Sequence, residues 1–340
     1  MKAASIKDLS GDELREAVEE FGMPAYRAGQ VYHWLYAGAV GSFDDMSDLP
    51  ADLRASLGER YAVDTLEKVR ERLSGDGTLK YLLKLADGNT IETVLIPVAG
   101  RKTVCLSSQV GCRFGCPFCA SGMGGFTRNL GQGELLDQVV AVKREGIAVT
   151  HIVFMGIGEP LDNLENVIRA VTVLNDPKGF GIGARRITIS TCGLVDGIGR
   201  LLKSGVRAEL SVSLHAPVDE LRDRLVPVNR RYPVKKLLGA CRKYYAVTKR
   251  VVTFEYALLD GINDSPALAR KLASLLDGFD CKVNLIKVGE VPIEGFRPSR
   301  REAAHRFRSI LRENGVKVTL RRQRGADIEA ACGQLRLRTL

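Results

Sequence analysis

The chain has 340 residues, of which 45% are hydrophobic and 26% charged, and its formal net charge is +10. This composition is typical of a folded globular protein and excludes a disordered or fibrous class. No 18 consecutive residues are apolar, and the polar start lacks the apolar segment of a signal peptide, so we expect a cytoplasmic protein without a membrane anchor.

Charge is distributed unevenly along the chain. Residues 1–100 contain 11 Lys/Arg and 17 Asp/Glu, whereas the remaining residues contain 39 and 23. Basic residues are densest in residues 297–340, with 12 Arg/Lys against four acidic residues. The positive electrostatic potential of such a basic region attracts a polyanion, usually nucleic acid. A solvated basic face without a partner has the same composition.

The first hundred residues predict two small units. Residues 1–62 are expected to form a helical domain, because Ser10 can cap GDELREAVEEFG and AYRAGQVYHWLYAG repeats apolar residues at helical spacing. Residues 63–98 alternate with period two and contain the turn signals Gly75-Asp76-Gly77 and Asp87-Gly88. They predict a short antiparallel β linker.

Residues 99–340 predict an α/β domain. Strand-like runs alternate with amphipathic helical stretches about six times; the runs are HIVFMG, ARRITIST, RAELSVSLH, VVTFEYALL, CKVNLIKV and KVTLRR. This pattern requires parallel strands joined by crossover helices, closed fully or partly into a barrel. We therefore expect a partial (β/α)6 barrel with its reactive groups at the C-terminal ends of the strands.

Three closely spaced cysteines give the strongest chemical signal. Cys112, Cys116 and Cys119 form a CxxxCxxC motif with no fourth Cys or His close behind it. A structural zinc site usually pairs two distant CxxC knuckles, whereas three cysteines on an iron–sulfur cube leave one iron open for another ligand. The spacing resembles that of the radical S-adenosylmethionine (radical-SAM) superfamily, in which the open iron binds S-adenosylmethionine. A zinc loop or three free thiols is the alternative.

Further candidate residues end the strand-like runs that follow. The segment GIGEP, with Gly158 and Glu159, resembles the superfamily motif that holds the methionine amino group. Glycine there would let the backbone approach a ligand closely. The next two runs end in polar residues that we expect to line the same rim, although a capping Ser or a structural His is common; the candidates are Ser190, Ser213, Leu214 and His215.

Several long segments resemble the family of radical-SAM RNA adenine methyltransferases, RlmN and its sister Cfr. The similarity covers nearly the whole chain. The segments are GMPAYRAGQVYHWLY, TVCLSSQVGCRFGCPFCASG, GFTRNL, FMGIGEPLDN, ITISTCG, SVSLHAP, LRDRLVPVNRRYP and DIEAACGQL. The resemblance implies a [4Fe–4S] cluster on Cys112, Cys116 and Cys119, and two S-adenosylmethionine molecules per turnover.

The resemblance also implies the roles of two more cysteines and a glutamate. Cys332 in DIEAACGQL would carry the methyl group as S-methylcysteine. Cys105 would resolve the protein–RNA adduct by forming a transient disulfide with Cys332, and Glu92 would accept the proton lost from the adduct. From the residues alone, both thiols would be interpreted as buried apolar side chains, and Glu92 would be interpreted as an exposed strand residue. The cysteines that match no such role are expected in the core; they are Cys192, Cys241 and Cys281.

The implied substrate is 23S rRNA, methylated at C2 of an adenosine in the peptidyl-transferase region, with tRNA as a second candidate. An electron donor such as flavodoxin or ferredoxin would reduce the cluster of a monomeric enzyme. Both C2 and C8 of adenine are electron-poor, so a radical route is needed, and the base must be unstacked to reach the site. The arginine pairs expected to contact phosphates are Arg185-Arg186, Arg230-Arg231 and Arg321-Arg322.

The chain departs from the family at one position. Many relatives have NLIPYNP or NLIPWNP, whereas this chain has Asn284-Leu-Ile-Lys-Val-Gly289. Gly289 therefore stands where an Asn often contacts S-adenosylmethionine, and we assign Gly289 no binding role. Backbone groups or Asn284 could take over that contact.

Three other functions remain open from the sequence. The nearest is C8 methylation of the same adenosine, as in Cfr, because both chemistries use the same five cysteines. A radical enzyme acting on a small molecule or a protein glycine would need the cluster motif but neither Cys105 nor Cys332. A non-catalytic RNA-binding protein would use the cysteine loop to hold zinc.

Overall fold

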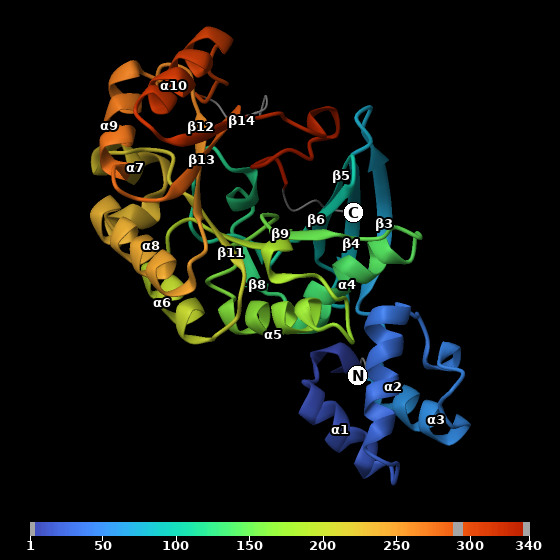
Figure 1. Ribbon diagram of the computed structural model, residues 1–340. Coiled ribbons are helices and arrows are strands. Elements are labelled where there is room, and N and C mark those ends of the chain that lie inside the picture. Colours follow the sequence, from blue (N-terminus) through green and yellow to red (C-terminus); the bar gives the residue numbers. More distant parts are fainter. Residues whose placement is uncertain (1–3, 288–294, 336–340) are drawn as a thin grey trace.

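A computed structural model of the chain describes residues 4–287 and 295–335 (Figure 1). They form a small N-terminal helical module and a larger α/β unit with a curved sheet, whose helices cover its outer side. Within the described ranges, no helix is both long and apolar enough to cross a membrane.

The N-terminal module begins and ends with short strands that pair with each other in parallel. Its elements are β1 (Ala4–Ser5), α1 (Gly11–Glu20), α2 (Tyr26–His33), α3 (Ala51–Arg60) and β2 (Tyr61–Ala62). The predicted cap is present, because the Ser10 hydroxyl accepts the Glu13 N–H at 3.2 Å and the Glu13 carboxylate accepts the Ser10 N–H at 2.6 Å. This capping box satisfies two N–H groups at the start of α1.

The antiparallel strands expected in residues 63–98 are built into the main sheet. The strands are β3 (Leu66–Leu73), β4 (Leu79–Leu85), β5 (Thr90–Val98) and β6 (Arg101–Cys105). Each pairs antiparallel with the next, and β6 also pairs in parallel with β9 (His151–Phe154). β6 pairs with β5 on one side and with β9 on the other, so it joins the antiparallel strands to the parallel sheet. These strands therefore extend that sheet and do not form a separate linker.

The predicted alternation of strands and helices forms a parallel sheet. Its other strands are β10 (Ile187–Thr191), β11 (Glu209–Ser213), β12 (Val252–Leu258), β13 (Cys281–Lys287) and β14 (Lys317–Arg321). The helices are α4 (Gln132–Lys143), α5 (Leu164–Asn175), α6 (Val195–Lys203), α7 (Asp219–Leu225), α8 (Val234–Thr248), α9 (Pro266–Leu276) and α10 (Arg301–Glu313). In the described residues the strand order is β14-β13-β12-β11-β10-β9-β6-β5-β4-β3, with β14 and β3 at its two ends. The curved sheet is thus a partial barrel, as predicted.

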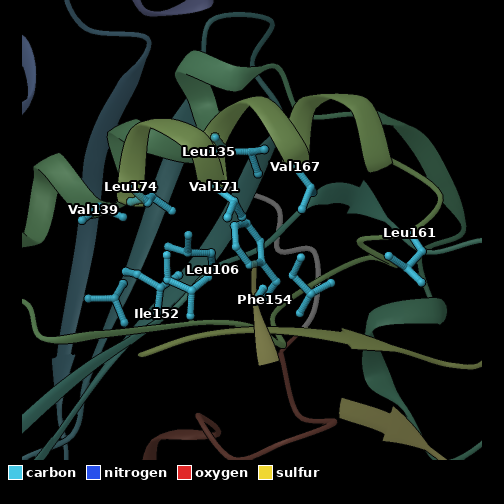
Figure 2. Packing of buried hydrophobic residues seen from close by; sticks show 14 of the residues in the cluster. Leu106, Leu135, Val139, Ile152, Phe154, Leu161, Val167, Val171 and Leu174 are labelled. Carbon is cyan, nitrogen blue, oxygen red and sulfur yellow. The ribbon is translucent and has the colours of Figure 1, made fainter. Parts of the chain in front are cut away.

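Two helices bury one side of this sheet. Figure 2 shows apolar side chains of α4 and α5 packed on those of β9 and the residue after β6. The residues labelled there are Leu106, Leu135, Val139, Ile152, Phe154, Leu161, Val167, Val171 and Leu174. Full burial of an aliphatic side chain contributes about 1.5–3 kcal/mol to the free energy of folding. The contacts between α4, α5 and β9 therefore stabilise this part of the sheet.

A buried ion pair joins the N-terminal module to the α/β unit. The Lys7 side chain is 0% exposed, and its ammonium donates to the Val63 carbonyl at 2.8 Å and forms an ion pair with Asp137 of α4. The other Asp137 oxygen accepts the Thr65 N–H and hydroxyl at 2.8 and 2.6 Å. These contacts hold the chain connection between module and sheet against α4.

We expect Asp137→Ala to destabilise the protein strongly. The substitution leaves the Lys7 ammonium buried with only the more distant Asp64 carboxylate, at 3.4 Å, as a charged partner. Loss of one member of a buried pair costs about 3–5 kcal/mol, measurable by urea denaturation. Asp12→Ala, which breaks an exposed pair with Arg15, should cost less than about 1 kcal/mol, and equal effects would contradict this assignment.

Candidate active site

The three motif cysteines lie on one loop at the cavity end of the sheet. This loop connects β7 (Gln109–Gly111) to β8 (Phe126–Asn129), which pair with each other and close its base. Cys112, Cys116 and Cys119 all line one cavity of about 160 Å³. Burial raises the pKa of the Cys112 thiol to about 12 and also raises the pKa of Cys116 and Cys119.

Gly158 and Glu159 also line this cavity, and each makes local contacts that shape its wall. Gly158 has a φ of +103°, and a Cβ there would lie 2.6 Å from the Gln109 Cβ. The glycine is thus required for packing against β7. The Glu159 carboxylate accepts the Leu161 N–H at 3.0 Å and the Cys192 N–H at 2.7 Å, so it ties the loop after β9 to the end of β10.

The predicted rim residues lie at the ends of β10 and β11. Ser190, Ser213 and His215 line the cavity, whereas the Leu214 side chain is 0% exposed in the hydrophobic core. Leu214 does not line the cavity, and its N–H and carbonyl are bonded to the Glu255 carbonyl and to Arg222. The Nδ1 atom of His215 accepts the Ala257 N–H at 2.9 Å, and burial lowers the His215 pKa to about 3. The neutral imidazole thus carries its proton on Nε2.

A buried arginine, which sequence analysis missed, holds this rim together. Arg222 of α7 is 0% exposed and donates to the carbonyls of Cys192 at 2.7 Å, Ser213 at 3.0 Å and Leu214 at 3.0 Å. It also donates to the Asn229 side chain at 2.9 Å. The only signal in the sequence is the segment LRDRLVPVNRRYP, whose charges look like those of a solvated helix.

Cys332 lies in the cavity wall, far along the chain from the cysteine loop. The adjacent backbone is fixed to that loop, because Ala120 N–H donates to the Gly333 carbonyl at 2.8 Å and the Ser121 hydroxyl to the Leu335 carbonyl at 2.7 Å. The Cys332 thiol itself is exposed. The fold therefore brings the C-terminal cysteine to the three motif cysteines.

Cys105 lies close behind Cys332, at the end of β6. It packs in a buried apolar cluster with Ile328, Ala330 and Leu335 from the C-terminal segment. Burial, with a smaller contribution from the charge of Cys332, raises the Cys105 pKa to about 12. The charge of Cys332 also contributes to the raised pKa of Cys119.

Glu92 is buried and ion-paired, whereas the strand position alone favours exposure. It is 1% exposed, and the Lys80 ammonium lies 3.0 Å from its Oε1. Lys80 also donates to the Glu329 carbonyl at 3.0 Å. Val94, two residues along β5, pairs with Cys105, so Glu92 faces the same side of the sheet as that thiol.

The other three cysteines divide into two kinds. Cys241 and Cys281 are 0% and 4% exposed in the hydrophobic core, as expected. Cys192 was expected there too, but it lines the cavity, and its pKa is raised well above the ordinary value by burial and by the nearby Glu159 carboxylate. Its place at the end of β10 puts it there. Gly289 lies outside the described residues, and Asn284 donates to Glu255 at 3.2 Å.

Within residues 4–287 and 295–335, no three His, Cys, Asp or Glu side chains converge as a site for a single metal ion. An iron–sulfur cluster does not require the three side chains to converge on one point, because each cysteine binds a separate iron. The three loop cysteines meet this requirement, since they line one cavity together with residues from the strand ends.

Comparisons with known proteins identify the family. Residues 106–272 match the model of the radical SAM superfamily, and residues 4–63 match the ribosomal RNA large subunit methyltransferase N-terminal domain. A probable dual-specificity RNA methyltransferase RlmN from Desulforamulus reducens is 46% identical over 98% of this chain and 96% of its own. The chain belongs to the RlmN family of radical-SAM RNA methyltransferases.

Other RlmN relatives agree along the whole chain. A probable dual-specificity RNA methyltransferase RlmN from Thermotoga neapolitana is 45% identical and covers 98% of both chains. The crystal structure of a radical SAM methyltransferase from Sphaerobacter thermophilus is 49% identical, has a TM-score of 0.94, and covers 98% of this chain and 99% of its own. The RlmN fold thus extends over both the helical module and the barrel.

Membership of the radical-SAM superfamily implies a [4Fe–4S] cluster and S-adenosylmethionine in an RlmN enzyme. The residues present fit both groups. The three loop cysteines would hold the cluster, and the polar atoms of Ser190, Ser213 and His215 face the same cavity for the second ligand.

We expect Gly158→Ala to destabilise this RlmN protein by about 1–3 kcal/mol. The new Cβ would overlap the Gln109 side chain, and its φ of +103° is strained for any other residue. Gly199→Ala is the matched control, because Gly199 lies within α6 with open space around it and should gain about 0.5–1 kcal/mol. Urea denaturation measures both, and a shift in the same direction would contradict the assignment.

Proposed function

We propose that this enzyme methylates C2 of an adenosine in the peptidyl-transferase region of 23S rRNA, and an adenosine of tRNA as a second substrate, through an S-methylcysteine on Cys332. The observation that carries this proposal is the place of Cys332, in one cavity with Cys112, Cys116 and Cys119 and close to Cys105. The two RlmN relatives described above are both named dual-specificity RNA methyltransferases, which supports two RNA substrates.

The chemistry of the target explains why the chain needs such a cavity. C2 of adenine lies between two ring nitrogens and is electron-poor, so it does not attack the methyl group of a sulfonium. When bound, the cluster and S-adenosylmethionine would supply a transferable methyl group, a radical able to remove a hydrogen atom, and an acceptor for the unpaired electron that the adduct must lose. The protein must then hold a methyl carrier where both the cofactors and the base can reach it.

Cys332 has the properties of that carrier. Its thiol is exposed to the cavity, while the backbone on either side is fixed by hydrogen bonds to Ala120, Ser121 and Lys80. As a thiolate it accepts the methyl group, and loss of a hydrogen atom from the S-methyl group leaves a carbon radical that adds to C2 of the base. The base is then joined to the protein through the Cys332 sulfur.

Cys105 and Glu92 would complete the reaction. A Cys105 thiolate attacks the Cys332 sulfur, forming the S–S bond and breaking the S–C bond, and the electron pair of the broken bond takes up a proton to complete the methyl group on the base. Because burial raises the Cys105 pKa to about 12, this thiol is protonated near neutral pH and must lose its proton before it attacks. Glu92, on the same face of the sheet, takes the proton lost from the adduct and is held in place by Lys80.

In vitro methylation of a 23S rRNA fragment by the reduced holoenzyme tests the function. We expect mass spectrometry of the digested RNA to detect 2-methyladenosine. 8-Methyladenosine would assign the enzyme to C8 chemistry. Cys332→Ala should abolish methyl transfer but retain cleavage of S-adenosylmethionine, because the cluster cysteines are intact. Full methyl transfer by Cys332→Ala would refute the proposal.

Cys105→Ala should trap the covalent protein–RNA adduct. Without the resolving thiolate, the bond between Cys332 and the base has no partner to break it. Denaturing gel electrophoresis with labelled RNA measures the adduct, and release of free methylated RNA at the wild-type rate would exclude this role. Cys281→Ala, which removes a core thiol from the opposite part of the sheet, should form product normally.

A further inference from the structure

A second, larger cavity opens into the interior of the sheet beside the cysteine cavity. Its volume is about 1060 Å³, and residues near the starts of the parallel strands line it, such as His151, Glu209 and Lys282. Most of its charged lining residues are basic; they are Arg101, Arg185, Arg207, Lys249, Arg250, Lys282 and Arg321. This basic cavity suits a phosphate backbone approaching from the side opposite to the cysteine loop.

Among the residues that the structure describes, three belong to the walls of both cavities. Met155, Glu255 and Arg321 line the cysteine cavity and the basic cavity alike. The residues expected to hold S-adenosylmethionine, such as Ser190 and His215, line the cysteine cavity only. A nucleotide that approaches Cys332 through the basic cavity therefore meets the three shared residues first.

Glu255 of β12 is the unusual member of this shared wall. It is 4% exposed, and its Oε1 accepts the Ser211 hydroxyl at 2.9 Å and the Asn284 amide at 3.2 Å. Among the described residues, its Oε2 has no hydrogen-bond partner. A buried carboxylate oxygen without a donor is costly, so a ligand that brings one would be bound selectively.

Arg321 of β14 supplies the complementary group. Arg321 lines the cysteine cavity together with Glu255 and Cys332, and the charges of Cys332 and Glu255 both raise the Arg321 pKa. An arginine can only donate and a carboxylate can only accept. The wall thus offers an acceptor and a donor side by side, next to the methyl-carrying thiol.

We propose that Glu255 selects adenine at the target position, its Oε2 accepting a hydrogen bond from the 6-amino group while Arg321 donates to the ring nitrogen N1. C2 is bonded to N1, so this orientation turns C2 toward Cys332. The inference rests on the proposed RNA substrate and deepens it. Glu255 is a specificity residue that contacts the base, and it takes no part in binding the cluster.

The test compares two forms of one 23S rRNA hairpin, with adenosine or purine riboside, which lacks the 6-amino group, at the target position. Wild-type holoenzyme should bind the adenosine hairpin about tenfold more tightly than the purine riboside hairpin, which is the effect of one hydrogen bond to a charged group. Its kcat/KM for methyl transfer should also be about tenfold higher with the adenosine hairpin. Equal binding of both hairpins by the wild type would overturn the proposal without any variant.

Glu255→Gln should bring the ratio between the two hairpins close to one. Ser211 and Asn284 would hold the Gln carbonyl, so its amide N–H would face the 6-amino donor, and the preference for adenosine would be lost. Glu209→Gln is the matched control, because Glu209 lines the basic cavity but pairs with Arg250, and it should keep the wild-type ratio. An unchanged ratio in Glu255→Gln would show a merely structural role and overturn the proposal.

The rate of Cys332 methylation in the absence of RNA, measured by intact-protein mass spectrometry, distinguishes a role of Glu255 in base selection from a role in binding S-adenosylmethionine. Glu255→Gln should methylate Cys332 at the wild-type rate, and a loss there would assign Glu255 to S-adenosylmethionine and overturn the proposal. If the wild type forms no methyladenosine at all, the proposed function fails, while the ratio of hairpin dissociation constants still decides the role of Glu255.

Discussion

A single buried guanidinium organises the edge on which the active site is built. The strand ends of β10 and β11 stop at the cavity, and the carbonyls of Cys192, Ser213 and Leu214 need hydrogen-bond partners there. Arg222 supplies all of them, and the several charge-assisted bonds offset the cost of burying the charge. Because these carbonyls are fixed, the polar side chains of Ser213 and His215 face the cavity in a defined orientation.

The C-terminal segment completes the site by joining two structures that are remote in sequence. Lys80 holds the Glu329 carbonyl from the antiparallel strands, and Ala120 holds the Gly333 carbonyl from the cysteine loop. Cys332 lies between these anchors with an exposed thiol, whereas Cys105 behind it is buried with a raised pKa. The exposure of the Cys332 thiol and the burial of the Cys105 thiol give these two neighbouring side chains different environments.

The interior of the parallel sheet holds two cavities of different character. The C-terminal ends of its strands gather the cysteines and the polar rim, while residues near the strand starts carry the basic side chains. The antiparallel strands lengthen the sheet at β6 and bring Glu92 and Lys80 to the same side as Cys105. The N-terminal module is fixed to α4 through Lys7, so it is part of the structure that presents the site.

The sequence by itself determined the features that depend on local spacing. The cap at Ser10, the alternation of strands and helices and the cysteine loop follow from nearby residues, and family resemblance named Cys332, Cys105 and Glu92. Only the tertiary structure decided that Arg222 is buried, that Cys192 lines the cavity and that the antiparallel strands extend the main sheet. Such features arise from contacts between residues far apart in the chain, and no local pattern of charge or hydrophobicity encodes them.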